Sequence, residues 1–339
     1  MRLIKTEDAV GHVLCHDMTQ IIKDQYKDAR FRKGHVVTEE DIPVLLSMGK
    51  EHLYVWEMTS GMVHENDAAE RLLALCGQEN MIRSGVKEGK IELKAACDGV
   101  FLVDSARLVA VNSQDEVMIA TRKGGMAVRE GDKLAGMRVI PLIIEEEKLR
   151  KAEQAAGDKP LLSLKPYVRK TACIVATGGE VKKGLIKDTF TPVVIDKLKT
   201  YGIETLEVVY SGDGVENVRD AVLTMREKKP DMILCTGGMS VDPDDNTPGG
   251  IKAAGANIIA YGAPVLPGAM FLLGYFDDGM PIMGLPGCVM YACATVFDLM
   301  LPKIAADVPV TRADIAALGE GGLCLGCKPC HYPICPFGK

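Results

Sequence analysis

Aromatic residues are scarce in this chain: they make up 5% of its 339 residues, and Trp56 is its one tryptophan. An all-β binder that lines its site with aromatic rings is therefore not expected. An excess of positive charge is also missing, since 40 Lys and Arg face 46 Asp and Glu and leave a net charge of −6. A protein that binds nucleic acid needs a basic surface to neutralise phosphates, so nucleic acid is excluded as the main partner.

Long apolar runs are missing as well. No stretch of about 18 uncharged apolar residues occurs, as a membrane-spanning helix requires, and segment 258–276, which comes nearest, is interrupted by glycines and prolines. Residues 1–8 lack the apolar stretch of a signal peptide. We therefore expect no membrane partner and a cytoplasmic location. Glycine, in contrast, is abundant at 35 residues, which favours an α/β protein with glycine turns.

The eleven cysteines are unevenly distributed. Four of them lie in the last sixteen residues and need their own explanation. The others stand singly, mostly in apolar surroundings, and are expected to be core thiols of a protein in a reducing compartment. These scattered cysteines are Cys15, Cys76, Cys97, Cys173, Cys235, Cys288 and Cys293.

The length predicts about two to three domains. Residues 1–57 are an opening segment, with a helix that has Thr38 as its N-cap and a short strand at Leu53–Trp56. Residues 58–157 are predicted to be an α+β, β-rich middle domain. Pro160 and Pro166 mark residues 157–168 as a linker.

Within the middle domain, helices are expected at 66–76 and 144–156, the second closed by Gly157. Short apolar runs at 100–103, 108–111 and 117–120 predict strands.

Residues 168–305 alternate strands and helices. Apolar strands at 171–176, 206–210 and 232–235 are separated by helical patterns, which predicts a parallel sheet with right-handed crossovers. The predicted fold class is α/β: a three-layer, mostly parallel sheet preceded by a smaller α+β, β-rich N-terminal region. Such sheets bind ligands at the carboxyl ends of their strands, where the Gly-Gly loops of this chain fall.

The first group of candidate site residues is Thr177-Gly178-Gly179-Glu180, followed by Asp188 and Thr189. Two glycines allow backbone N–H groups to approach a ligand closely. Glu180 and Asp188 offer carboxylates for a cation or a nucleotide. The alternative is a tight turn followed by a helix that Asp188 or Thr189 caps.

The second group runs from Thr236-Gly237-Gly238-Met239-Ser240 through three aspartates to Thr247-Pro248. A helix that starts at Thr247-Pro248 would direct N–H groups at an anion. Carboxylates beside an anion repel it unless Mg²⁺ bridges the two, so the composition suggests a metal-assisted phosphate site. The alternative is an acidic solvated loop with a good N-cap.

The third group consists of two Pro-Gly turns, at Pro267-Gly268 and at Gly284-Leu285-Pro286-Gly287. The second turn is expected to open a helix over Val289–Leu301, whose N-terminus would face a phosphate. Ordinary turns between strands and helices are the alternative for both.

The order and spacing of these groups resemble the molybdopterin-binding domain of molybdenum-cofactor biosynthesis. Molybdopterin adenylyltransferases, molybdopterin molybdotransferases and gephyrin share this domain. The matching region is residues 170–305, with the motifs TGGE, TGGMSV, Asp245-x-Thr-Pro, Pro-Gly and GLPG. Residues 34–56 resemble the segment that precedes the domain in the molybdotransferases, and the two regions cover about half of the chain.

The resemblance implies roles for individual residues. Asp245 and Asp188 match acidic residues to which the family assigns catalytic roles. Asp245 matches the one that is linked with Mg²⁺ and nucleotide handling. Phosphate on backbone amides and Mg²⁺ on carboxylates agree with the chemistry read from the residues. The expected cofactor-binding residues are Thr177, Gly178, Gly179, Glu180, Gly237, Gly238, Ser240, Thr247, Gly268, Gly284 and Gly287.

Two positions depart from the family's pattern. Asparagine or serine usually follows the Gly-Leu-Pro-Gly motif, and here Cys288 stands there. A thiol at a helix N-terminus would have a lowered pKa, whereas a packed one would be inert. The first Pro-Gly is followed by Ala269 and Met270, which supply no charge.

The tail, residues 319–339, carries the pattern C-x₂-C-x₂-C-x₄-C, formed by Cys324, Cys327, Cys330 and Cys335. It is close to a ferredoxin pattern, including the proline after the last cysteine, but has four intervening residues where ferredoxins have three. Thiolates at this density suit an iron–sulfur cluster or tetrahedral zinc, with His331 as a substitute ligand. A redox-sensitive or disordered tail is the alternative, and the glycines ahead of it suggest a tethered module.

Three functions follow as hypotheses. The first is a transferase that binds molybdopterin, free or adenylylated, inserts molybdate with Mg²⁺ and releases nucleotide. The second is a carrier that binds the pterin without turnover and docks on a molybdoenzyme client. The third is a nucleotide hydrolase related to the competence-damage proteins, which resemble the same domain. The resemblance also implies a homo-oligomer.

Overall fold

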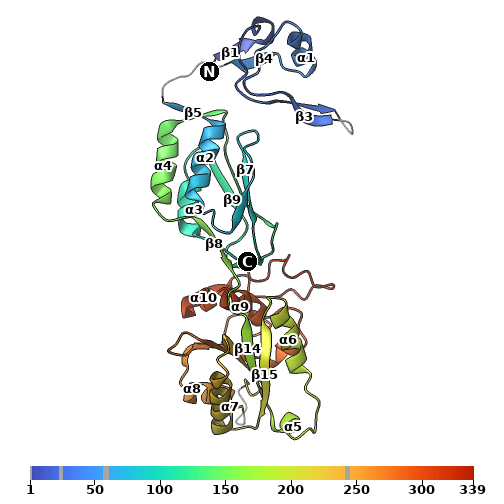
Figure 1. Cartoon of the computed structure of the whole chain (residues 1–339), viewed down its shortest axis with the longest axis vertical. Coiled ribbons are helices and arrows are strands. Elements are labelled where there is room, and N and C mark those ends of the chain that lie inside the picture. Colours follow the sequence, from blue (N-terminus) through green and yellow to red (C-terminus); the bar gives the residue numbers. More distant parts are fainter. Residues whose placement is uncertain (1, 23–25, 56–60, 241–244) are drawn as a thin grey trace. The chain divides into compact units, whose positions relative to one another are not determined.

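The computed structural model describes residues 2–22, 26–55, 61–240 and 245–339 (Figure 1). The chain divides into two compact units. The first unit comprises residues 1–96, 103–122 and 131–163, and the second comprises residues 97–102, 123–130 and 164–339.

The first unit begins with short antiparallel strand pairs. β1 (Arg2–Lys5) pairs with β4 (His52–Val55), and β2 (Met18–Ile22) pairs with β3 (Tyr26–Phe31). A small core around Leu14, Leu45 and Leu53 holds this part together. The predicted strand at Leu53–Trp56 is present up to Val55, and Trp56 lies outside the described residues. The helical elements are η1 (Thr6–Asp8) and α1 (Asp41–Ser47), so α1 begins after Thr38, its predicted cap.

The rest of the first unit is an antiparallel sheet covered by helices. The sheet has the order β6 (Met81–Arg83), β7 (Ile91–Ala95), β11 (Lys133–Val139), β9 (Val117–Thr121), and β5 (Met62–His64) pairs separately with β12 (Ile143–Glu145). The helices are α2 (Glu65–Leu75), α3 (Ser105–Asn112) and α4 (Glu146–Ala156). Arg71 of α2 joins α4 by ion pairs to Glu146 and Glu153, 2.8 and 2.7 Å long.

Two sequence predictions are wrong in this region. Residues 108–111, predicted as a strand, belong to helix α3, because Asp104 accepts a hydrogen bond from the Arg107 N–H and caps it. The linker expected at 157–168 contains strand β13 (Leu162–Pro166), which pairs with β8 (Gly99–Val103) beside β10 (Met126–Val128). Burial of Leu162 and Leu164 explains why this proline-flanked stretch is ordered.

The second unit is built on a six-stranded sheet. Its order is β15 (Glu204–Ser211), β14 (Thr171–Thr177), β16 (Met232–Thr236), β19 (Pro281–Leu285), β18 (Leu272–Tyr275), β17 (Asn257–Tyr261). The first four strands are parallel, and β18 and β17 continue the sheet antiparallel. The predicted α/β class with a mostly parallel sheet is thereby confirmed.

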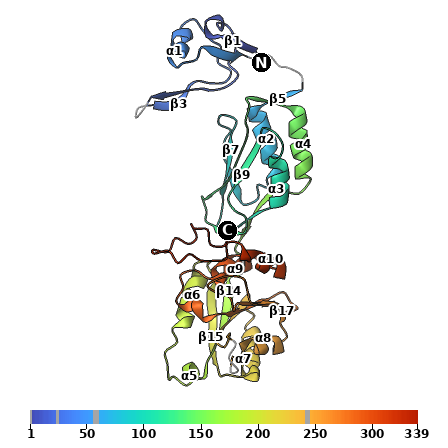
Figure 2. The ribbon, with the colours of Figure 1, turned by 180° about the vertical axis from the view of Figure 1, so that it is seen from behind.

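Helices cover both faces of this sheet and complete three layers. Along β14, Ala172 and Ile174 face one core, whereas Cys173 and Val175 face the other, as the two-residue period of a strand requires. The first core takes side chains from α6 (Phe190–Lys199), α9 (Val296–Ala305) and α10 (Arg312–Ala316). The second core takes them from α7 (Val215–Glu227) and α8 (Thr247–Ala253), which lie side by side in Figures 1 and 2. The shorter helices are α5 (Gly179–Lys182), η2 (Gly287–Met290) and η3 (Ala317–Gly319).

The helix predicted over Val289–Leu301 starts later than expected. A 3₁₀ turn, η2, follows Pro286, and α9 begins only at Val296. Thr295 and Asp298 form a capping box that satisfies the first N–H groups of α9 and sets its start. The Gly-Leu-Pro-Gly turn is therefore separated from the N-terminus of this helix.

The tail is packed on the second unit, and the expectation of a tethered module is wrong. Phe337 is buried in the first core of the sheet, against which Tyr332 and Cys335 also pack. The Tyr332 hydroxyl donates to the Asp298 carbonyl at 2.9 Å, and the Cys324 N–H donates to the Leu266 carbonyl at 2.8 Å. In Figure 1 the tail, drawn in red, lies at the α9 end of the unit.

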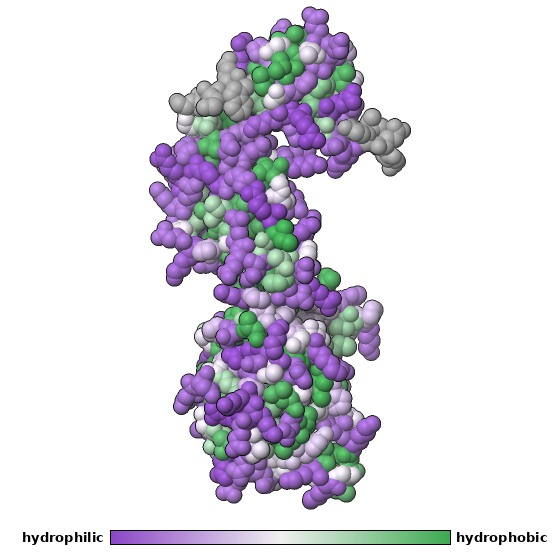
Figure 3. Space-filling view, viewed as in Figure 1, coloured by the Kyte–Doolittle hydropathy of each residue, from purple (hydrophilic) through white to green (hydrophobic). Residues whose placement is uncertain are grey.

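Among the described residues no helix is long and apolar enough to cross a membrane. On the face shown in Figure 3, hydrophobic side chains lie in small patches among hydrophilic ones.

Phe337→Ala tests how firmly the tail is packed. Because the ring is only 2% exposed, we expect the free energy of unfolding to fall by about 3–5 kcal/mol. The control is Ile334→Ala in the same tail, whose side chain is 87% exposed and whose loss should change stability by less than about 0.5 kcal/mol. Denaturant unfolding measures both, and equal effects would contradict the packing described here.

Candidate functional site

The loops that the sequence singled out meet at one edge of the sheet. β14, β16 and β19 are adjacent and parallel, and their register pairs Ala176 with Thr236 and Thr236 with Leu285. The three loops that follow these strands therefore leave the sheet at the same level. This is the carboxyl edge, where parallel sheets bind ligands.

Two threonines hold the loop after β16 in place, and we call them the threonine pair. Thr177 Oγ1 donates to the Thr236 carbonyl and Thr247 Oγ1 donates to the Gly237 carbonyl, both at 2.9 Å. The two hydroxyl oxygens lie 3.2 Å apart, and Thr247 is buried. Both protons point at backbone carbonyls, so the pair shapes the loop.

Gly237 and Gly238 are glycines for reasons of space and conformation. Their φ angles are +82° and +58°, in the left-handed region. A Cβ on Gly237 would lie 2.4 Å from the Thr177 carbonyl oxygen, and one on Gly238 would lie 2.5 Å from Thr247 Oγ1. The close approach of loop and threonine pair therefore requires both glycines.

Asp245 closes the same loop. Its Oδ2 accepts the Ser240 N–H at 2.9 Å, and the Ser240 side chain is exposed. Tyr261 donates to the Met239 carbonyl at 3.0 Å; burial raises the pKa of its phenol, and the nearby Asp245 carboxylate raises it further. The two other aspartates of this loop, Asp242 and Asp244, lie outside the described residues.

Asp188 caps helix α6. Its Oδ1 accepts the N–H groups of Phe190 and Thr191 at 2.9 and 3.0 Å, and its Oδ2 accepts the Tyr210 hydroxyl at 3.2 Å. Burial by itself raises the pKa of Asp188, but the hydrogen bonds from Thr191, Phe190 and Tyr210 outweigh it and hold the pKa below its ordinary value. Asp188 and Asp245 thus belong to separate hydrogen-bond networks.

The loop after β14 is closed by a residue that sequence reasoning missed. Asp213 Oδ2 accepts the Gly179 N–H at 3.1 Å, next to Gly178 with its φ of +141°. The signal was available, because Gly212-Asp213-Gly214 directly follows the parallel strand β15. The side chain of Glu180 lies outside the described ones.

The remaining glycines differ in what surrounds them. A Cβ on Gly284 would lie 2.6 Å from Met239 Sδ, and one on Gly268 would lie 2.6 Å from Val296 Cγ1, so both glycines serve packing. A Cβ on Gly287 would meet nothing within 4 Å. Gly287 therefore stands out as a glycine whose backbone borders open space.

Cys288 is not an activated thiol. Burial raises its pKa, and helix α9, whose N-terminus would lower it under the first alternative, begins eight residues later. The structure therefore fits the alternative in which Cys288 is a packed, inert thiol.

A buried ion pair that the sequence did not suggest joins α6 to the start of α9. Lys197 Nζ donates to the Cys293 carbonyl at 3.2 Å and forms an ion pair with Asp298. Both side chains are largely buried, so the lysine charge is compensated within the protein. It ties α6 to the start of α9.

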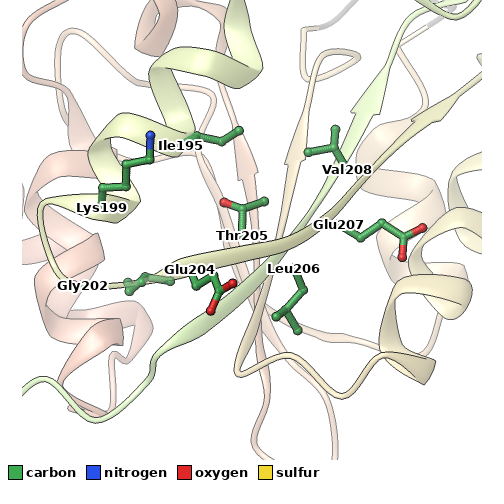
Figure 4. A pocket seen from close by; sticks show the side chains of 9 residues that line it. Ile195, Lys199, Gly202, Glu204, Thr205, Leu206, Glu207 and Val208 are labelled. Carbon is green, nitrogen blue, oxygen red and sulfur yellow. The ribbon is translucent and has the colours of Figure 1, made fainter.

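A pocket of about 600 Å³ lies away from these loops, between α6 and β15 (Figure 4). Ile195, Lys199 and the first half of β15 line it. None of the candidate residues of the carboxyl edge line it, so it does not form part of the predicted site.

The tail cysteines come together. Cys324, Cys327, Cys330 and Cys335 line one cavity with His331. However, no group of three or more His, Cys, Asp or Glu is arranged to hold a metal ion within the part of the chain that the structure describes.

Gly238→Ala tests the close packing of the loop. We expect a loss of unfolding free energy that exceeds the loss in Gly255→Ala by about 1–3 kcal/mol, the usual cost of overpacking. Gly255 is the control, because its φ of +90° is also positive while a Cβ there meets nothing within 4 Å. Thermal or denaturant unfolding compares the two variants. Equal losses of unfolding free energy would show that the threonine pair leaves room for a Cβ on residue 238.

Asp188→Ala tests the cap of α6 and its pH dependence. The depressed pKa means that the ionised carboxylate stabilises the fold above the unfolded-state pKa, and this contribution is lost as pH falls through the folded-state pKa. The variant should therefore lose about 1 kcal/mol at pH 7, and the gap to the parent should narrow below roughly pH 4. Asp196→Ala, on the exposed side of the same helix, should show no such narrowing. The measurement is the unfolding free energy of each protein from pH 3 to 7. A difference between Asp188→Ala and the parent that is constant with pH would refute the stabilisation of α6 by an ionised Asp188.

Comparison with known proteins delimits two regions. Residues 173–306 match the family model described as a probable molybdopterin binding domain, and residues 3–57 match a domain of unknown function. CinA-like proteins from Mycobacterium tuberculosis and Petrotoga mobilis are 33% and 32% identical to the chain over 76 residues, 22% of this chain. The chain spans less than a fifth of the length of these curated relatives: 18% and 19%.

Two solved structures resemble parts of the chain, one over about the same region and the other over most of the chain. MoaB, a molybdopterin biosynthesis enzyme from Thermus thermophilus, is 17% identical with a TM-score of 0.35, over 41% of this chain and 98% of that one. A molybdenum cofactor biosynthesis protein from Pyrococcus furiosus is 12% identical with a TM-score of 0.27, over 93% of this chain and 64% of that one. The family assignment rests on the domain model, whose limits coincide with the six-stranded sheet and α9. Over residues 173–306, less than half of its length, the chain therefore resembles the family described as a probable molybdopterin binding domain.

Proposed function

We propose that the second unit binds molybdopterin, free or adenylylated, at the carboxyl edge of its sheet and takes part in molybdenum-cofactor biosynthesis. The observation that carries this proposal is the convergence of the three glycine loops on one edge, within the region that matches the molybdopterin-binding family. A cytoplasmic location and a homo-oligomer belong to the same proposal.

The phosphate of the pterin is expected on backbone amides. The loop from Gly237 to Ser240 is held by the threonine pair, and the exposed Ser240 side chain and the open backbone at Gly287 border the solvent. Amides in such loops bind anions without a positive side chain. Ala269 and Met270, which carry no charge, are therefore compatible with binding.

Of the two candidate carboxylates, Asp245 suits Mg²⁺ better. Hydrogen bonds occupy both oxygens of Asp188, whereas within the described ranges Asp245 accepts a hydrogen bond at Oδ2, from the Ser240 N–H. Mg²⁺ commonly takes one or two carboxylates and completes its shell with waters and substrate phosphates. We therefore assign Asp245 as the Mg²⁺ ligand and Asp188 as a positioning residue that fixes the start of α6.

With Mg²⁺ at Asp245, the activity that fits is molybdate insertion with release of nucleotide from adenylylated molybdopterin. The bound ion would offset the repulsion between the carboxylate and the phosphate. The carrier alternative uses the same loops without turnover and delivers the pterin to a molybdoenzyme client.

A second candidate function is hydrolysis of a nucleotide without any pterin. The observation in its favour is the match to CinA-like proteins over 76 residues. Nucleotide release in the absence of pterin would support it and count against molybdate insertion.

Asp245→Asn tests the main proposal. The variant keeps an acceptor for the Ser240 N–H but loses the charge, so we expect intact folding, loss of Mg²⁺-dependent molybdate insertion, and pterin binding that Mg²⁺ no longer strengthens. Calorimetric titration of the anaerobically handled protein with molybdopterin, with and without Mg²⁺, measures the binding.

The control is Asp220→Asn on α7, an exposed carboxylate paired with its neighbour Arg219, which should behave as the parent. Absence of binding by the parent would refute the pterin site. Mg²⁺-enhanced binding without turnover by the parent would favour the carrier. Retained turnover in Asp245→Asn would refute the role given to Asp245.

A further inference from the structure

We propose that the cysteine tail binds one zinc ion through the thiolates of Cys324, Cys327, Cys330 and Cys335. The proposal is independent of the pterin site. It starts from the cavity that these cysteines line together with Ala294, Tyr332 and Phe337.

The tail cysteines differ from the other cysteines in their setting. Cys76 and Cys235 are buried singly in apolar surroundings, which raises the pKa of each thiol to about 12 and keeps it protonated. The four tail cysteines are half-buried or exposed, and they share one cavity, so an ion can reach them from solvent. Thiolates suit zinc, in contrast to magnesium or calcium, which prefer oxygen ligands.

The backbone around the cavity is fixed at both ends. The Cys324 N–H donates to the Leu266 carbonyl, and Phe337, two residues after Cys335, is buried in the core. Between them, the Tyr332 hydroxyl donates to the Asp298 carbonyl. The cavity thus lies on a defined surface of the second unit, while Cys327 and Cys330 lie in the exposed stretch between the two ends.

The cavity has room for a single ion. Its volume is about 20 Å³, and about 10–15 Å³ is needed for one water molecule. A zinc ion requires only that the sulfurs draw in to about 2.3 Å from it.

Binding has to tighten the cysteines, since the described residues contain no group of three in ligand geometry. The exposed position of Cys327 and Cys330 lets these two side chains move without disturbing the core. His331 lines the same cavity but is not needed for a tetrahedral site. We therefore assign the four thiolates as ligands and leave His331 outside the first coordination sphere.

The consequence of the ion is mechanical. It would join Cys324, whose backbone is bonded to Leu266, to Cys335 beside Phe337. Leu266 precedes Pro267, whose carbonyl accepts the Val296 N–H at the start of α9. Zinc would therefore stabilise the Pro267-Gly268 turn and the tail as one piece.

The experiment uses the full chain, purified anaerobically and reconstituted with Zn²⁺ alone. Elemental analysis should give one zinc per chain after gel filtration, and cobalt substitution should give thiolate-to-metal absorption bands. Cys327→Ser and Cys330→Ser should each lower zinc affinity by more than about 100-fold, since loss of even an outer-sphere group costs about 10–100-fold.

Two controls separate the ligands from their surroundings. Cys293→Ser removes an exposed cysteine that does not line the cavity, and His331→Ala removes the fifth donor. Both should keep one zinc with unchanged affinity. Cys327 and Cys330 are exposed, so their serine variants should fold, and circular dichroism verifies this.

Iron with acid-labile sulfide bound at the same cysteines would overturn the single-ion site. So would a parent protein that retains no zinc, or serine variants that bind zinc as the parent does. Because none of these readouts involves pterin, failure of the zinc site is distinguishable from failure of the pterin site.

Discussion

The contact between the hydroxyls of Thr177 and Thr247 is the constraint on which the carboxyl edge depends. Each hydroxyl gives its proton to a backbone carbonyl, and together they join the end of β14, the loop after β16 and the first turn of α8. The space they take is the reason that Gly237 and Gly238 cannot carry side chains. The backbone conformation of Gly237 and Gly238, the close approach of the loop and its hydrogen bonds therefore all depend on the threonine pair.

The fold of the second unit was predictable because its signals are local and repeated. Buried strands such as Thr171–Thr177 are continuous apolar runs, and helices such as Val215–Glu227 show a helical period in the sequence. The first unit was harder, since the apolar run at 108–111 has the composition of a strand, yet it lies in a helix whose start is capped by the hydrogen bond from the Arg107 N–H to the Asp104 carboxylate. The later start of α9 has the same origin, because a capping box at Thr295 decides it.

The site was predictable as a set of loops, but the roles of its members were not. A sequence shows that Gly284 follows a strand, but not that Met239 fills the space above it. It shows an acidic residue at 188, but not that two amides and a tyrosine use both of its oxygens. Contacts between distant segments, such as Asp213 with Gly179, require the fold before they can be assigned.

The parallel arrangement of β14 and β16 also governs how the second unit forms. Thr171 and Asp231, hydrogen-bonded at the beginning of these strands, are 60 residues apart in the chain. The chain must lose the entropy of that loop before the pairing returns any free energy. Proteins dominated by such contacts fold more slowly than helical bundles of the same size. During that interval the apolar strands are unpaired, and unpaired strands of this kind are prone to aggregate.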